Sequence, residues 1–268
     1  MPACAMTDAV LVRQVDQAQA AASLLLSRRA CMLGAAVLAV AALLILALGR
    51  CTEVDLALAD SMYDARAGAF PWRDAWLTVT FNHRIVKAAL TALAALLIAA
   101  ASCDAFFPLQ WLDHGLGRLK LRVIACAAVL VPLAVGLLKQ ASDAHCPWDL
   151  ARYGGTQPYT RLFGALSPDA FPGHCLPAGH ASTALWMVSL AVLWLPGQTR
   201  KARDAAVAAL ALGCAVGWLQ QMRGAHFLTH TLWSMWIACA VVLALVAALQ
   251  AGAGRPRRAP ARIPRRAP

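Results

Sequence analysis

Charged residues are scarce in this chain, and acidic residues are the scarcest. Only 14% of the 268 residues are charged, with 13 acidic residues against 24 lysines and arginines. Hydrophobic residues make up 60% of the chain, and the mean hydropathy is +0.60. So few charges exclude an ordinary soluble domain and are typical of a helical membrane protein. We therefore expect the chain to be embedded in a membrane.

The excess of basic residues gives a net charge of +11, which in a soluble protein would suggest a nucleic-acid partner. Here the basic residues gather beside apolar runs and in the C-terminal tail, Arg255–Pro268. That placement indicates membrane topology and contact with anionic headgroups. We expect membrane lipids as partners, and no nucleic acid.

Two further absences concern cysteine spacing and targeting. The nine cysteines lack the spacing of a metal site. Those in or near apolar runs are expected to be small buried hydrophobic residues; they are Cys31, Cys103, Cys126, Cys214 and Cys239.

Residues 1–30 lack the pattern of a cleavable signal sequence, because charges interrupt their short apolar groups. We expect this segment to be a cytoplasmic extension.

Long apolar runs are what the sequence does have. Alanine and leucine dominate them and no run alternates, so helices are favoured over barrel strands. Several runs are shorter than the ~20 residues that cross a bilayer and must extend into their polar flanks. The predicted fold is an all-α bundle of six transmembrane helices over residues 31–250, followed by a basic tail at 251–268. The runs are Cys31–Gly49, Ala88–Ala105, Val123–Leu138, Ala181–Leu195, Ala205–Met222 and Thr231–Gln250.

The segments between the runs alternate in basic content. By the positive-inside rule the segments before runs one and three, and after runs four and six, are cytoplasmic. Their basic residues are Arg28, Arg29, Arg118, Lys120, Arg122, Arg200, Lys201, Arg203 and the six arginines of the tail. The other segments, roughly 50–87, 139–179 and 223–230, then face outward. In a bacterium this orientation leaves both termini in the cytoplasm and turns the outward segments to the periplasmic face of the inner membrane.

The first outward segment is rich in aromatic residues, namely Phe70, Trp72, Trp76 and Phe81. Aromatic rings of this kind lie at headgroup level. The segment therefore predicts an interfacial helix pair, which either forms a substrate lid or packs over the mouth of the bundle.

Three polar clusters lie at the outward ends of apolar runs. The first begins at Lys139 and continues through 145–155, the second is Pro177–Ser182, and the third is Arg223–Thr231. Taken singly, Lys139 could snorkel or pair with Asp143, and Pro177–Ser182 could be a turn with a capping serine. If the three ends share one side of the membrane, they form one site.

The combined clusters suit phosphoryl transfer. Three histidines, His180, His226 and His230, accompany a lysine, arginines and the N-terminus of a helix at Ala178–Gly179. Cations and helix N–H groups hold phosphoryl oxygens, one histidine attacks phosphorus, and another protonates the leaving oxygen. Two histidines four residues apart could instead bind zinc, but no glutamate lies between them. We expect no metal and no cofactor.

This arrangement resembles the type 2 phosphatidic acid phosphatase (PAP2) family, membrane relatives of the vanadium haloperoxidases. The family's motifs are Lys-x6-Arg-Pro, Pro-Ser-Gly-His and Ser-Arg-x5-His-x3-Asp. The stretch Lys139-x6-Cys146-Pro147 matches the first except at arginine, and Pro177-Ala178-Gly179-His180 matches the second except at serine. The resemblance implies six transmembrane helices, an outward site and a phosphohistidine intermediate.

The third motif can be placed in two ways. Anchored on Gly-x-His, it makes His226 the nucleophile and places His230 where aspartate is expected and Gln220 where arginine is expected. Anchored on Arg223, it points to His230, with Ser234 at the aspartate position. The first placement is preferred, and His180 is then the acid.

The departures from the motifs assign further roles. Cys146 cannot hold phosphate as arginine does, so Arg152 is the nearest substitute and joins Lys139 and Arg223 as a phosphate ligand. Ala178 and Gly179 keep their backbone N–H groups for the phosphate. The missing aspartate leaves His226 to be oriented by His230, a backbone carbonyl or water.

Cys146 and Cys175 flank the large outward loop, and we expect them to form a disulfide in an oxidising compartment. The alternative is that each is simply a small buried residue.

The predicted function is hydrolysis of a lipid phosphate or pyrophosphate at the outer leaflet. The resemblance implies phosphatidic acid, phosphatidylglycerol phosphate, polyprenyl pyrophosphate or lipid A phosphates as substrates. Transfer of the phosphoryl group to another lipid is one alternative. A non-catalytic lipid-binding or transport protein is another, although polar residues at helix ends rather than at mid-membrane speak against transport.

Overall fold

The computed structural model describes residues 24–110, 112, 116–165 and 170–253. Most of the predicted N-terminal extension and nearly all of the basic tail lie outside these residues. Within them the chain is helical, and its only extended pairings are two isolated bridges, Asp64 with Ala69 and Leu150 with Gln157. The all-α prediction is confirmed for this part of the chain.

In the described part of the chain, five helices are long and apolar enough to cross a membrane: Arg28–Cys51, Leu77–Phe106, Leu116–Gln140, Thr199–Met222 and Leu228–Gly252. The helices α2 (Arg28–Cys51), α5 (Leu116–Gln140), α7 (Thr199–Met222) and α8 (Leu228–Ala253) are continuous α-helices. The second span joins a π-helix, η1 (Leu77–Val86), to α4 (Lys87–Phe106). The fourth predicted run forms a shorter apolar helix, Gly179–Trp194, built from α6 (Gly179–Leu185) and the 3₁₀-helix η4 (Trp186–Trp194).

The long helices extend beyond their apolar runs, because polar residues at the flanks are helical too. The third run begins at Val123, but α5 begins at Leu116 and includes three basic residues before the run. The second span begins at Leu77, well before Ala88. The predicted interfacial helix pair is therefore wrong in its second half. Within residues 50–76, all of which the structure describes, α3 (Val54–Met62) is the one separate short helix, and Trp76 directly precedes the long span.

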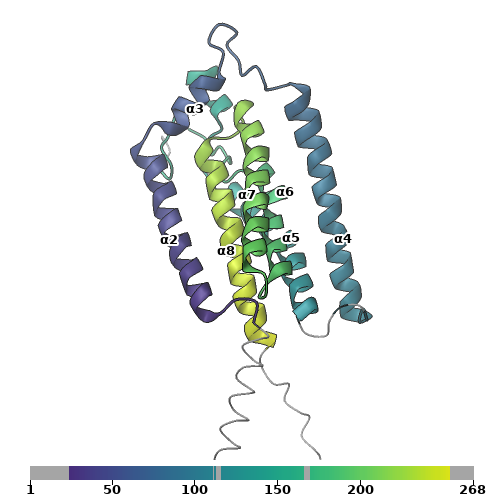
Figure 1. The fold of residues 1–268 in the computed structure, drawn as a ribbon. Coiled ribbons are helices and arrows are strands. Elements are labelled where there is room, and N and C mark those ends of the chain that lie inside the picture. The colour runs from purple at the N-terminus through teal and green to yellow at the C-terminus, as the bar shows by residue number, and fades with distance from the viewer. Residues whose placement is uncertain (1–23, 111, 113–115, 166–169, 254–268) are drawn as a thin grey trace, which may run out of the picture.

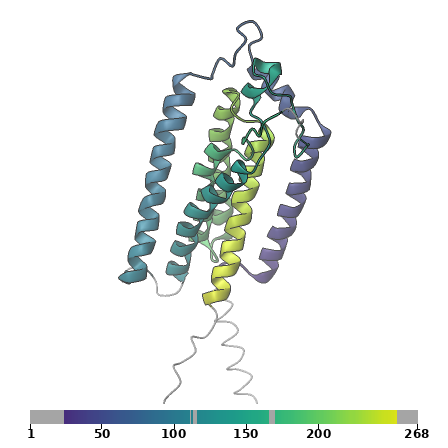
Figure 2. The same ribbon diagram turned by 180° about the vertical axis from the view of Figure 1, so that it is seen from behind.

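The helices lie roughly along one axis, with α2 and α4 on the outside and α8, α7, α6 and α5 between them (Figure 1). Seen from behind, the same order is reversed (Figure 2). The start of α2 and the end of α8 lie at one end of the bundle (Figure 1). Helix α3 and the loop between α5 and α6 lie at the opposite end (Figure 1). This loop carries the 3₁₀-helices η2 (Pro147–Asp149) and η3 (Ala151–Tyr153).

The core lies where α5, α6, η4 and α8 meet. Fully buried side chains include Val123 and Val131 of α5, Leu185, Trp186, and Val246 of α8. In contrast, α2 leaves most of its large apolar side chains exposed, such as Leu33 at 65% and Leu43 at 66%. In a membrane protein, lipid covers such a face, so α2 borders the bundle rather than filling it.

Candidate functional site

The third cluster lies in the turn between α7 and α8, where Gly224 has a φ of 73°, a conformation that glycine adopts without strain. The carbonyl of Gly224 accepts a hydrogen bond from the Trp148 N–H at 3.0 Å. Trp148 belongs to η2 in the first cluster. The Arg223 guanidinium carbon lies 5.8 Å from the centre of its ring, and that of Arg73 lies 5.1 Å from it. Trp148 therefore joins the first cluster to the third.

A disulfide joins the first cluster to the second. Cys146 and Cys175 are bonded, with their Cα atoms 5.4 Å apart. The Cys175 Sγ lies 3.4 Å from Nδ1 of His226, which is buried at 3% exposure. Both sulfurs and this nitrogen lie within 4.8 Å of one another, but sulfurs bonded to each other are not the thiolates that bind a metal. Cys175 thus packs all three clusters together around His226.

Lys139 lies against the start of α6. A Cβ atom at Gly179 would lie 3.8 Å from the Lys139 Cδ, so the side chain passes over the second cluster. In the described part of the chain Lys139 forms no ion pair, and the pairing with Asp143 that would have explained it structurally is not seen. The charge of Lys139 acts on His180, His226 and His230 alike.

The surroundings of His226 favour the neutral form of its imidazole. Burial is the largest effect that lowers its pKa well below the ordinary histidine value, and interaction with the His230 imidazole, the Lys139 charge and the His180 imidazole lowers it further. Contact with the Cys175 backbone opposes these effects. A neutral imidazole carries the free lone pair that attack on phosphorus requires.

Arg223 is the arginine at this cluster. Its Nε donates to the Arg73 carbonyl at 2.8 Å, and one terminal nitrogen donates to the Gln220 Oε1 at 3.1 Å. The other terminal nitrogen has no hydrogen-bond partner among the described residues. Gln220, fully buried, stands where the family motif has arginine. The glutamine therefore positions an arginine three residues further along.

Arg152 is placed differently. Its guanidinium forms a two-pronged ion pair with Asp60 of α3, with N–O distances of 2.8 and 2.6 Å, and its side chain is 53% exposed. Arg152 and Tyr153 hold the pKa of Asp60 below its usual value, the Arg152 hydrogen bond most of all. The structure thus connects Arg152 to α3, whereas its predicted contact with phosphate stays a prediction.

The N–H groups of the second cluster differ in availability. The Ala178 N–H donates to the His230 carbonyl at 3.1 Å, so it is not free to bind phosphate as predicted. The Gly179 N–H has no such partner among the described backbone hydrogen bonds. Ser234 donates to the carbonyls of Ala178 and His230, both at 3.0 Å, and not to an imidazole. This geometry gives no support to Ser234 as the group that orients His230.

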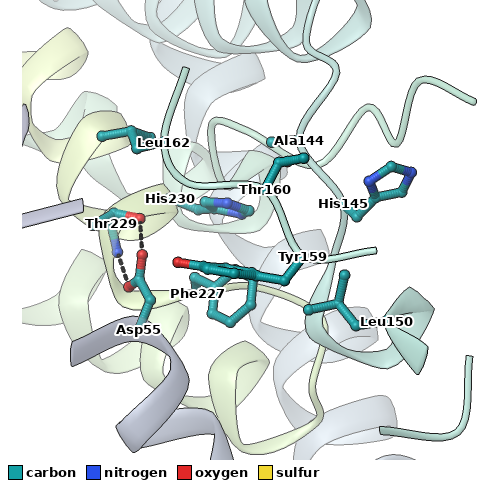
Figure 3. Close-up of a pocket in the computed structure, with 10 residues that line it drawn as sticks. All are labelled: Asp55, Ala144, His145, Leu150, Tyr159, Thr160, Leu162, Phe227, Thr229 and His230. Atoms are coloured by element: carbon teal, nitrogen blue, oxygen red, sulfur yellow. Dashed lines mark hydrogen bonds between the residues drawn. The ribbon is translucent and has the colours of Figure 1, made fainter. Parts of the chain in front are cut away.

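His230 lines a small cavity of about 20 Å³ together with Tyr159 and Asp55 (Figure 3). Its Nδ1, like that of His145, is buried and has no hydrogen-bond partner among the residues that the structure describes. On the same cavity Asp55 of α3 accepts hydrogen bonds from the Thr229 N–H at 3.0 Å and from its hydroxyl at 2.5 Å. Burial raises the pKa of Asp55, although both of these hydrogen bonds lower it. Asp55 therefore caps α8 from another helix.

Sequence reasoning missed a fourth group, at the start of the second span. His83 of η1 lies against His180, with ring centroids 4.2 Å apart and a hydrogen-bond contact between His83 Nδ1 and His180 Nε2. The charges of Lys87 and Arg223 act on both imidazoles. The signal was available, because Asn82-His83-Arg84 and Lys87 also stand at the end of an apolar run. It was read instead as part of an interfacial segment.

These observations define an all-α protein with five candidate membrane helices and a histidine-rich, cationic site at one end of its bundle. Comparison of the sequence with protein families identifies one superfamily. Residues 120–252 match the PAP2 superfamily, so the chain carries a PAP2 superfamily domain, which implies phosphatase-type hydrolase activity on a phosphate ester. No curated protein and no solved structure matches the chain significantly.

Proposed function

We propose that this membrane phosphatase hydrolyses a lipid phosphate or pyrophosphate through a phosphohistidine on His226. The observation that carries the proposal is the convergence of all three motif clusters on one buried imidazole. The Cys175 Sγ contacts the His226 Nδ1, and the charge of Lys139 acts on the ring. With Nδ1 held in this way, Nε2 is the nitrogen left to attack phosphorus.

The remaining residues fit the other requirements of the reaction. Lys139 and the free terminal nitrogen of Arg223 bind the equatorial oxygens, and the N–H of Gly179 adds a donor at the helix start. His180 protonates the leaving lipid oxygen and later removes a proton from the attacking water. His230 lies in the first turn of α8 and lines the small cavity beside Asp55, and it is not the group that attacks phosphorus.

The bundle supports a lipid substrate presented from the membrane. The site lies at one end of the apolar helices (Figure 1). A headgroup at the interface reaches such a site while its chains remain in the bilayer. The six-helix arrangement belongs to this proposal, with Gly179–Trp194 as the sixth, shorter membrane segment. The positive-inside argument assigns this end to the outer, periplasmic face.

Purified protein incubated with phosphatidic acid, phosphatidylglycerol phosphate, polyprenyl pyrophosphate and lipid A tests the proposal by the phosphate released. We expect turnover of at least one lipid, loss of turnover and of any phosphoenzyme in His226→Ala, and full activity in the presence of chelators. Phosphate appearing on a second lipid would instead show a phosphotransferase. Failure to act on every lipid would contradict the proposal, and activity lost in His230→Ala but kept in His226→Ala would exchange their roles.

Substitution of Arg223 and of Arg152 should lower the activity to different extents. Arg223→Ala removes a transition-state donor and should lower kcat/KM by about 10²–10³-fold. Arg152→Ala removes an exposed ion pair with Asp60 and should lower it by less than about tenfold. Arg66→Ala, an exposed arginine at the same end of the bundle, is the control and should leave activity unchanged. A large loss in Arg152→Ala with none in Arg223→Ala would restore Arg152 as the phosphate ligand.

A further inference from the structure

The contact between His83 and His180 joins the predicted acid to a second titratable group. The two rings come from different spans, η1 and α6, and meet through His83 Nδ1 and His180 Nε2. Two imidazole nitrogens make a hydrogen bond only if one carries a proton and the other a lone pair. The pair therefore shares a proton at this contact, and His180 Nδ1 is the nitrogen left to face a leaving group.

The surroundings of His83 fix its position. The neighbouring Asn82 is 3% exposed and donates from Nδ2 to the Val216 carbonyl of α7 at 3.2 Å. Thr78, one π-turn earlier, donates to the carbonyls of Trp72 and Ala75. The π-helical turn is itself a geometry that recurs at functional sites. His83 is only partly buried, so it connects His180 to the aqueous end of the bundle.

We infer that His83 is a proton-relay residue, which supplies His180 with the proton for the leaving oxygen. The inference rests on the proposed function. In the first step His83 starts protonated at both nitrogens, beside the bound phosphate dianion. His180 gives its Nδ1 proton to the leaving oxygen as the P–O bond breaks and the bond to His226 forms. His83 passes its Nδ1 proton to His180 Nε2 and becomes neutral. In the second step water attacks the phosphohistidine and its proton goes to His180 Nδ1. The His180 Nε2 proton then returns to His83, which restores both rings.

The charges around the pair explain why a relay is useful. Lys87 of α4 and Arg223 after α7 act on both rings, Arg84 of η1 acts on His83, and Lys139 of α5 acts on His180. A lasting positive charge on His180 is therefore opposed. A partner nearer to water can give up the proton and regain it at each turnover, while the bound phosphate dianion offsets the surrounding positive charge.

Enzyme kinetics on two substrates test the relay. His83→Gln keeps a hydrogen-bonding side chain but cannot be protonated. It should lower kcat for phosphatidic acid, a poor leaving group, by about 10–100-fold, and that for an aryl phosphate by less than about threefold. The alkaline limb of the kcat–pH profile should shift, and added imidazole should partly restore His83→Ala. His174→Asn removes an exposed histidine from the same end, where φ is 47° and asparagine is tolerated. This control should match the wild type.

Three outcomes would overturn the relay. They are equal losses on both substrates, which a merely structural role predicts, an unchanged pH profile, and wild-type kinetics in His83→Gln. If the wild-type protein hydrolyses no lipid, the proposed function fails, and the contact is tested separately. In NMR spectra of ¹⁵N-histidine-labelled protein in detergent, His83→Gln should shift the His180 ring nitrogens while His174→Asn does not. Unchanged His180 signals would contradict proton sharing.

Discussion

His226, the proposed nucleophile, is buried, and burial that disfavours a charged imidazole favours the neutral form that can attack phosphorus. Its imidazole is buried beside the Cys175 sulfur. Burial and the charge of Lys139 disfavour its protonated form, whereas the contact with the Cys175 backbone favours it. The family motif would place an aspartate four residues further on, and this chain has His230 there. In the structure the ring instead contacts Cys175, through its sulfur and its backbone, and no family motif includes this residue.

The pH dependence of stability should report this burial. A histidine whose folded pKa lies below its unfolded value near 6.5 binds a proton more readily in the unfolded state, so stability falls as pH drops below about 6.5. At one pH unit below that value the loss is about 1.4 kcal/mol for one such group. His226→Asn cannot be protonated and should lose that much less on acidification. The check is thermal unfolding in detergent at pH 7.5 and 5.5, and equal losses in both proteins would contradict the buried neutral form.

The start of α8 is the element that organises the site. Its first turn carries His230, and Asp55 of α3 caps it through Thr229, a residue 174 positions away in sequence. Helix α7 packs closely beside it at Gly217. A Cβ there would lie 2.4 Å from the Cγ2 of the buried Thr231, which also accepts a hydrogen bond from Gln221. The absence of a side chain at Gly217 thus sets how near α7 lies to the first turn of α8.

Two glycine-to-alanine substitutions distinguish the effect of close packing on stability from the effect of helix propensity. Gly217→Ala should destabilise the protein by about 1–3 kcal/mol, because the buried Thr231 side chain must move. Gly136→Ala, in α5, meets nothing within 4 Å and should be neutral or slightly stabilising. Unfolding midpoints in detergent measure both. If the two variants behave alike, close packing at Gly217 is not what holds α7 to α8.

Local patterns predicted the helices better than their ends. All six apolar runs are helical, because apolar composition without alternation is a local property. The ends were misjudged where polar residues continue a helix, as in Leu77–Lys87 and Leu116–Arg122. Of the site, the three clusters could be found because each stands at the end of a run. The contacts of His83, Asp55 and Arg152 could not, since their partners are 92 to 174 residues away along the chain.

At the scale of the whole molecule, the bundle separates two kinds of basic residue. At the end that carries the site, Arg161 is paired with Glu53 and Arg152 with Asp60, while Lys139 and Arg223 belong to the site. At the opposite end basic residues flank the helices, among them the run Arg200–Arg203 at the start of α7. The positive-inside rule places the end with more lysine and arginine in the cytoplasm. The site end therefore faces outward only if the six arginines of the tail are counted with the basic residues at the opposite end.

Reporter fusions decide this orientation. Fusions at Gln198, which precedes α7, and after Gly252, near the end of α8, should both report the cytoplasm. A fusion at Thr156, in the loop between α5 and α6, should report the periplasm, because an odd number of membrane segments separates that loop from each of the other two points. Removing the tail after Gly252 tests the charge argument itself, since the loss of six arginines should weaken the bias. A cytoplasmic signal at Thr156 would place the site on the inner face and reverse the assignment. The same location reported at Thr156 and Gln198 would mean that Gly179–Trp194 does not cross the membrane.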